Sequence, residues 1–183
     1  MLKTKEEIQA WLDEMRIKNY TINDDLTVDV DGTVKISNKK LVEIPVQFGI
    51  VVRDFDCSRN KLTSLKGSPR ECVGFYCSHN KLTSLVGAPQ KCWYFNCSNN
   101  KLTSLEFAPK ECTEFDCYNN KLTTLKFVPK ECREIHCYNN KLTSLEGAPK
   151  SSDIISDFSK EEIEAYKNGG KIKESRLSKF RKD

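Results

Sequence analysis

The sequence has few of the residues on which enzymes and membrane proteins depend. Only two histidines, His79 and His136, occur among 183 residues, and there is neither a phosphate-binding loop nor a Cys-x-x-Cys pair. No apolar run is long enough to cross a membrane, and the N-terminal segment is charged and amphipathic, unlike a signal peptide. The sequence therefore predicts a cytoplasmic protein without cofactor, metal site or membrane contact.

The chain contains one motif of about twenty residues five times between Phe55 and Ile154. The five copies begin FDCSRNKLTSL, FYCSHNKLTSL, FNCSNNKLTSL, FDCYNNKLTTL and IHCYNNKLTSL. A short fixed period is typical of a solenoid, in which each unit buries its apolar face against its neighbours. A degenerate copy over residues 34–45 precedes these, so we expect six units.

Each F-x-C segment alternates with a period of two, which predicts a strand. Phe75 and Cys77 should point inward, and Tyr76 and Ser78 outward, in a parallel sheet with strands about 4.8 Å apart. An asparagine recurs where the chain leaves each strand, and its amide can satisfy backbone groups of the turn. These asparagines are Asn60, Asn80, Asn100, Asn120 and Asn140. A proline recurs in each copy and favours an extended segment, rather than a helix, opposite the sheet.

The residue spacing within a unit resembles the leucine-rich repeat pattern LxxLxLxxNxLxxL, with Cys or aromatic residues at several Leu positions. In unit 72–91 the matching residues are Cys72, Phe75, Cys77, Asn80, Leu82 and Leu85. The unit length and the LTSL segment are similar to the short bacterial subtype. The motif CSNNKLTSL resembles even more closely the small Cys- and Asn-rich repeat proteins of bacteriophages and large DNA viruses.

The resemblance implies an α/β leucine-rich repeat solenoid, curved as a short arc. Its concave side would be a parallel sheet, its convex side extended, and both ends covered by helical caps. The resemblance also implies a protein-binding module, such as a phage or bacterial accessory protein that modulates a host factor. We expect an N-terminal helix and strand cap at 1–30, six leucine-rich repeats at 31–155, and a C-terminal helix with a basic tail at 156–183.

Local patterns predict the elements at the two ends. Thr4 and Glu7 form a capping box that predicts the start of one helix. A second capping box predicts a helix at 160–167, docked through Ile163 and Tyr166. Alternation over residues 26–36 around an Asp-Gly pair predicts a hairpin with a type I′ turn, leading into the first repeat strand.

The nine cysteines fall in two columns at inward positions of the repeat. They are Cys57, Cys77, Cys97, Cys117 and Cys137, and Cys72, Cys92, Cys112 and Cys132. We interpret them as small core residues stacked in ladders. Buried thiols are poor nucleophiles, and disulfides are not expected in a reducing compartment.

The outward positions of the strands differ from unit to unit, whereas the framework positions hardly vary. Variation confined to one face is typical of a binding surface on a repeating frame, although drift at exposed positions is an alternative. Several of these residues are large aromatics, which commonly anchor interfaces. We predict that a protein partner binds this face through Asp54, Asp56, Tyr76, Trp93, Tyr94, Glu114, Asp116, Tyr118, Glu134, His136 and Tyr138.

Nucleic-acid binding and enzymatic activity are two other functions to compare with protein binding. A lysine column and the basic C-terminal tail could follow a phosphate backbone, so a nucleic-acid-binding module is the alternative function. The column is Lys61, Lys81, Lys101, Lys121 and Lys141, and it also suits plain solubility. His136, Glu134 and Asp116 would bring an acid and a base together, but no exposed nucleophile accompanies them. We therefore expect no enzymatic activity.

Overall fold

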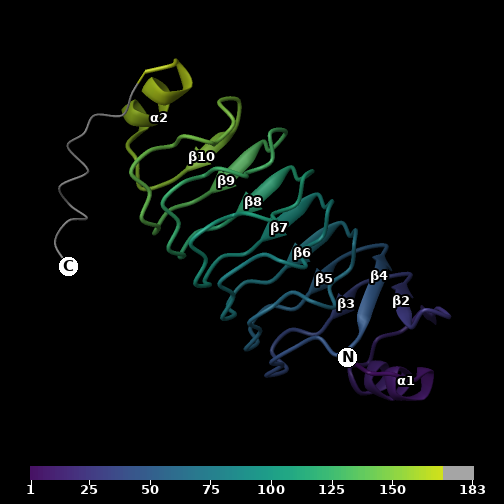
Figure 1. Ribbon diagram of the computed structural model, residues 1–183. Coiled ribbons are helices and arrows are strands. Elements are labelled where there is room, and N and C mark those ends of the chain that lie inside the picture. Colours follow the sequence, from purple (N-terminus) through teal and green to yellow (C-terminus); the bar gives the residue numbers. More distant parts are fainter. Residues whose placement is uncertain (171–183) are drawn as a thin grey trace.

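The computed structural model describes residues 1–170, which form a β-solenoid built from stacked repeats (Figure 1). One strand per turn enters a seven-stranded sheet in the order β10-β9-β8-β7-β6-β5-β3, and all its pairs are parallel. The strands are β3 (Val34–Lys35), β5 (Phe55–Asp56), β6 (Gly74–Tyr76), β7 (Tyr94–Asn96), β8 (Glu114–Asp116), β9 (Glu134–His136) and β10 (Asp153–Ile155). The solenoid and its parallel sheet are thus confirmed. From β5 onward, the segments between these strands run through turns, bends and single β-bridges.

The register of the sheet brings equivalent positions of successive units side by side. Phe55 pairs with Phe75, Phe75 with Phe95, and Phe95 with Phe115. Neighbouring rings in this column lie 5.2–5.6 Å apart between centroids, and every one is buried. The predicted alternation of inward and outward residues is therefore confirmed, and one aromatic column forms the centre of the core.

The asparagine positions form a second ladder, as predicted. The side-chain amide group of each asparagine donates two hydrogen bonds to backbone carbonyls. One accepting carbonyl belongs to the cysteine three residues earlier, and the other belongs to the equivalent position in the preceding unit. Its side-chain oxygen accepts a backbone N–H from the preceding unit. Each side chain therefore satisfies turn groups of two units at once.

The cysteines occupy the core positions expected for them. All nine are free thiols, and eight are buried, while Cys72 is partly exposed. Burial raises the pKa of the Cys97 and Cys117 thiols well above the ordinary value, because the thiolate would lose its hydration. These residues thus behave as small apolar core residues.

A second sheet lies at the N-terminal end of the stack, and the hairpin predicted around Asp31-Gly32 is wrong. The strands β1 (Tyr20–Ile22), β2 (Thr27–Val30) and β4 (Gln47–Val51) form this sheet in the order β1-β2-β4. β2 pairs antiparallel with β1 and parallel with β4, while β3 joins the repeat sheet instead. The chain turns at 23–26, where the N–H of Leu26 donates to the carbonyl of Asn23.

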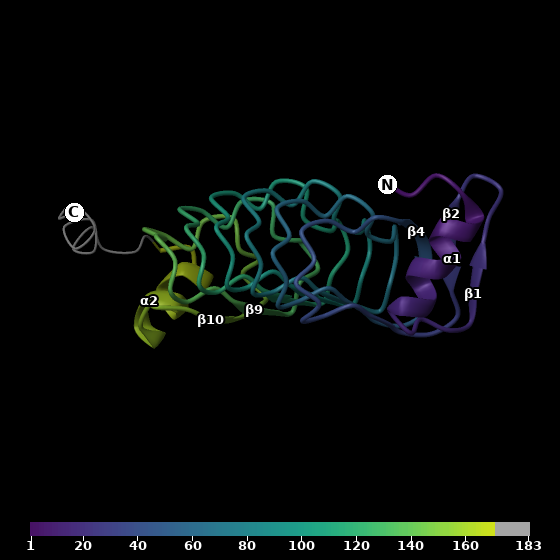
Figure 2. The same ribbon diagram turned by 90° about the horizontal axis from the view of Figure 1, so that it is seen from below.

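Helices α1 (Lys5–Glu14) and α2 (Lys160–Lys167) lie at opposite ends of the stack (Figure 2). Both begin at the capping boxes that the sequence predicts. α1 buries Ile8 and Leu12. In α2 the Tyr166 hydroxyl donates to the carbonyl of Ala148 at 2.6 Å, and Ile163 also packs against the core. No helix within residues 1–170 is long and apolar enough to traverse a membrane. The basic tail of the nucleic-acid hypothesis, at 171–183, lies outside the described residues.

Candidate protein-binding surface

The predicted binding residues other than Trp93 come together on the outward side of the repeat sheet, which we call the sheet face, and Trp93 lies beside it. Strand pairing aligns Gly74, Tyr94, Glu114 and Glu134 in one column, and Tyr76, Asn96, Asp116 and His136 in the next. The columns match those expected from the repeat. What the sequence does not reveal is how closely these side chains contact one another.

A polar network joins neighbouring strands at the centre of the sheet face. The Tyr94 hydroxyl donates a short hydrogen bond to one Asp116 oxygen, and the Asn96 amide donates to the same oxygen at 3.1 Å. The other Asp116 oxygen lies 3.0 Å from His136 Nδ1, while His136 Nε2 lies 2.7 Å from Glu134 Oε1. The five side chains are thereby fixed relative to one another.

Asp116 is buried within this network, although its position in the strand points outward. Its residue surface is only 7% exposed. Burial raises the pKa of Asp116, the nearby Glu134 carboxylate raises it further, and the Tyr94 hydrogen bond and His136 act in the opposite direction. Burial and the Asp116 carboxylate likewise raise the pKa of Tyr94. Tyr94 therefore stays a neutral hydrogen-bond donor.

Two tyrosine pairs lie in and beside this network, and one of them is stacked. The rings of Tyr76 and Tyr94 lie 5.1 Å apart, and those of Tyr118 and Tyr138 stack at 4.6 Å with an angle of 8° between their planes. Gly74 makes room for this arrangement, since an added Cβ there would lie 2.7 Å from the Tyr76 ring. The tyrosines form a rigid aromatic surface.

Two aspartates complete the predicted set towards the N-terminal end of the face. Asp56 is partly buried, and its Oδ1 accepts hydrogen bonds from the N–H and hydroxyl of Ser58. Asp54 lies beside Gly74, where its Oδ1 would be 2.7 Å from an added Cβ. Both carboxylates raise the pKa of Tyr76, after the larger effect of burial. This end of the face is therefore acidic.

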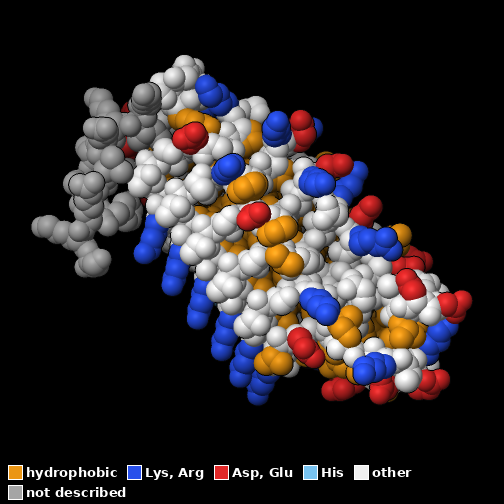
Figure 3. All heavy atoms as spheres, in the orientation of Figure 1, with side chains coloured by type: hydrophobic (Ala, Val, Ile, Leu, Met, Phe, Trp, Pro, Cys, Tyr) orange, Lys and Arg blue, Asp and Glu red, His pale blue; other side chains and the backbone are white. Residues whose placement is uncertain are grey.

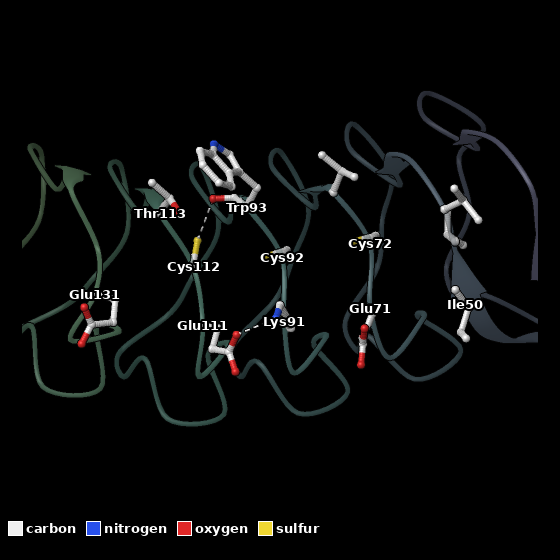
Figure 4. Close-up of a pocket in the computed structure, with 13 residues that line it drawn as sticks. Ile50, Glu71, Cys72, Lys91, Cys92, Trp93, Glu111, Cys112, Thr113 and Glu131 are labelled. Carbon is white, nitrogen blue, oxygen red and sulfur yellow. Dashed lines mark hydrogen bonds and ion pairs between the residues drawn. The ribbon is translucent and has the colours of Figure 1, made fainter.

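An apolar groove of about 640 Å³ runs beside the sheet face, and the sequence did not predict it. One wall carries Val52, Val73 and Trp93, which are all exposed, and Trp93 is 58% exposed. Cys72, Cys92 and Cys112 lie between this wall and an opposite charged row (Figure 4). Hydrophobic side chains also gather along the middle of the molecular surface in Figure 3. One wall and the floor of the groove are therefore mainly apolar.

The opposite wall of the groove is mainly acidic. Isolated parallel bridges link Ile50 to Glu71, Glu71 to Lys91, and Lys91 to Glu111. Lys91 and Glu111 form an ion pair of 2.8 Å, and Glu131 extends the wall. On the floor, burial raises the pKa of the Cys72 thiol to about 12, with a smaller contribution from Asp54. This cysteine therefore remains a neutral thiol at neutral pH.

The lysine column forms a regular ladder at another edge of the stack. All five side chains are exposed. From Lys81 onward, each backbone N–H donates to a leucine carbonyl of the preceding unit, as in the bond of 2.9 Å from Lys81 to Leu62. Figure 3 shows basic side chains projecting in an even row from one edge. The repeat thus sets the lysines about one strand spacing apart.

Comparisons with known proteins do not assign this chain to a family, so any function has to be inferred from the geometry of these surfaces. No protein-family model matches the chain, and a search of curated proteins also gives no match. Within residues 1–170, no group of three or more His, Cys, Asp or Glu side chains is arranged to hold a metal ion.

Proposed function

We propose that this protein is a non-catalytic protein-binding module of the short leucine-rich repeat type, with helical caps at both ends. Its partner binds to the sheet face and the adjoining apolar groove. The observation that carries the proposal is Trp93, which is 58% exposed on the groove wall and directly precedes Tyr94 of strand β7. Exposed tryptophan beside an apolar groove is typical of an interface anchor.

The rigid side chains of the sheet face support the same function. Ordering flexible side chains opposes association, and Tyr94, Asp116 and His136 already hold one another in place. The stacked rings of Tyr118 and Tyr138 offer a broad amphipathic surface at little cost in entropy. Acidic groups on both the face and the groove wall favour a partner that presents Lys or Arg near its apolar contact residues.

The arrangement of His136 supports a role without catalysis. Both ring nitrogens are engaged by carboxylates, at 3.0 Å and 2.7 Å. The nearby Tyr94 hydroxyl has a raised pKa and donates to Asp116, so it is a poor nucleophile. The resemblance to phage and bacterial repeat proteins extends the proposal to an accessory role, in which binding modulates a host factor.

The test compares proteins captured by immobilised wild-type protein and by a Trp93→Thr variant. Thr113 stands at the equivalent position one unit later, so threonine suits the local backbone. We expect a specific partner to be lost with Trp93→Thr and retained by a Lys81→Ser, Lys101→Ser, Lys121→Ser variant. Calorimetry with the purified partner should show a loss of about 2 kcal/mol or more for Trp93→Thr. An unchanged affinity for that variant would refute the groove as the binding site.

The lysine ladder keeps nucleic-acid binding as a second candidate. Five exposed lysines at the spacing of parallel strands form a linear cationic edge. This candidate predicts oligonucleotide binding that weakens steeply with salt and is lost in the triple lysine variant. The Trp93→Thr variant should then bind the oligonucleotide as tightly as the wild-type protein does.

A further inference from the structure

A small pocket at the N-terminal end of the stack combines cations from two separate segments. Arg16 follows helix α1, whereas Lys35 and Lys39 belong to strand β3 and the turn after it. These three side chains line a pocket of about 340 Å³ together with the hydroxyl residues Thr33 and Ser37. Among residues 1–170, no carboxylate lines this pocket, and none of its lining residues also lines the groove beside the sheet face.

The three cations have no acidic partner within the described part of the chain. None of them forms an ion pair there, although strand pairing aligns Lys35 with Asp56. The Asp56 Oδ1 instead accepts hydrogen bonds from the N–H and hydroxyl of Ser58. All three cations are exposed, so an anion in solution can reach them. Like charges that line one pocket repel one another, and an anion bound between them would offset that repulsion.

The end of helix α1 accounts for only one of these charges. A cation near a helix C-terminus is favourable, because the last carbonyls together carry about half a negative elementary charge. Arg16 directly follows the C-cap residue Met15 and has a φ of 59°, the left-handed conformation in which glycine is usual. Lys35 and Lys39 lie outside this helix, so its dipole does not explain their position. Three full positive charges outweigh the partial charge of the helix, and the pocket therefore attracts anions.

Two apolar residues complete the pocket, and its backbone is held in place. Met15 and Ile17 also line it; Ile17 is buried, and Met15 packs against the core. The N–H of Ile17 donates to the Leu12 carbonyl at 2.9 Å, and the N–H of Lys39 donates to the Asn60 side-chain oxygen at 2.9 Å. These hydrogen bonds fix the chain on both sides of the pocket. The site therefore presents a cationic part and an apolar part at fixed positions.

We propose that this cationic pocket binds a small phosphate monoester that carries an apolar group. The phosphoryl oxygens pair with the Arg16 guanidinium and with the ammonium groups of Lys35 and Lys39. The two hydroxyl groups that line the pocket donate further hydrogen bonds, and the apolar group of the ligand packs against the two apolar side chains. A monoester is favoured over a phosphodiester because it carries about −1.5 to −2 charges at neutral pH. The volume, at the lower end of the range for ligand pockets, suits a small molecule.

The probe is phenyl phosphate, titrated into the full-length, isotope-labelled protein and followed by NMR. We expect saturable shifts confined to the backbone amides around residues 15–17 and 33–39. Inorganic phosphate should bind more weakly, and benzyl alcohol, which carries no charge, should not bind. Lowering the pH from about 7.5 to about 5 should weaken the binding of phenyl phosphate, because its second ionisation has a pKa of roughly 6. Equal affinity for inorganic phosphate, or shifts centred elsewhere in the protein, would overturn the proposal.

A pair of charge-matched variants separates this pocket from general attraction to a basic surface. Arg16→Gln with Lys39→Gln should weaken the binding of phenyl phosphate by at least about tenfold, because charge-assisted hydrogen bonds are lost. The control is Lys18→Gln with Lys40→Gln, since both lysines are exposed neighbours that are not among the lining residues. This control removes the same net charge and should keep the wild-type affinity. All four side chains are exposed, so both variants should fold with nearly the wild-type Tm. Equal weakening by the two variants, or no saturable binding to the wild-type protein, would overturn the proposal.

Discussion

The side-chain oxygen of Asn80 accepts a hydrogen bond of 2.9 Å from the backbone N–H of Leu62, one unit earlier in the stack. The amide of Asn80 also donates to the carbonyls of Cys57 and Cys77, at 3.0 Å and 3.1 Å. One side chain therefore satisfies three backbone groups and ties two units together.

Asn80→Ala should lower the free energy of unfolding by at least roughly 1–3 kcal/mol, because buried backbone groups lose their partner. Urea unfolding provides the measurement. His79→Asn is the matched control, since His79 is exposed with φ 54° and asparagine stands at that position in later units. The control should change stability by less than about 0.5 kcal/mol. Equal effects of the two substitutions would contradict the ladder.

Ser68→Ala should stabilise the protein by about 1 kcal/mol. Ser68 is 4% exposed, and its hydroxyl has no hydrogen-bond partner among the described residues. Three of the four later units carry alanine at this position. The reciprocal change, Ala88→Ser, should destabilise by a similar amount in the same urea assay. Destabilisation by Ser68→Ala would mean that the hydroxyl makes a favourable interaction.

The repeat predicted most of the solenoid because its periodicity reports directly on burial. Phe75 and Cys77 recur with period two within a unit and with period twenty between units, which sets both the inward face and the register. The strands of the N-terminal sheet are not part of a repeat, so no periodicity indicated how they pair. Strand β1 has only three residues, and the Asp31-Gly32 pair imitates a hairpin turn. The pairing of β2 with β4 depends on contacts between residues about twenty positions apart, which local patterns do not report.

Thiol labelling should be slow in the native protein, and Cys72 should react first. It is the one cysteine that is partly exposed, yet its pKa of about 12 leaves little thiolate at pH 8. Mass spectrometry after brief treatment with iodoacetamide should show at most one modification, absent from a Cys72→Ser variant. Rapid modification of several cysteines in the folded protein would contradict their place in the core.

The stability difference between wild type and Asp116→Asn should depend on pH. Because the folded protein raises the pKa of Asp116, it binds this proton more tightly than the unfolded chain does. Protonation therefore stabilises the fold. That contribution is complete below the ordinary carboxyl pKa and is lost as pH rises through the raised value.

Asp116→Asn has no carboxyl to titrate at this site. The free energy of unfolding of wild type minus that of the variant should therefore fall as pH increases across this range. Chemical denaturation at several pH values measures the difference, and NMR titration of the Asp116 carboxyl gives its pKa directly. A difference that rises with pH would mean that Tyr94 and His136 outweigh burial.

The geometry of the candidate surface could be predicted only in outline. The outward columns followed from alternation, and Trp93 was predicted to lie beside them. The groove was missed because Ile50 and Val52 belong to the N-terminal sheet strand and its end, outside the repeat pattern. The burial of Asp116 was missed too, because Tyr94 covers it from the adjacent strand, and such packing is invisible in one unit.

The uniform register has a consequence for the length of this protein. Removing residues 81–100 would bring Asn80 next to Lys101, so that every remaining turn would follow a turn of the same kind. The new interface would again pair phenylalanine with phenylalanine and asparagine with a backbone N–H of the unit before. Loss or duplication of a whole unit therefore preserves the fold. The same event adds or deletes one set of sheet-face residues, so under the proposed function the binding surface would change in steps of twenty residues.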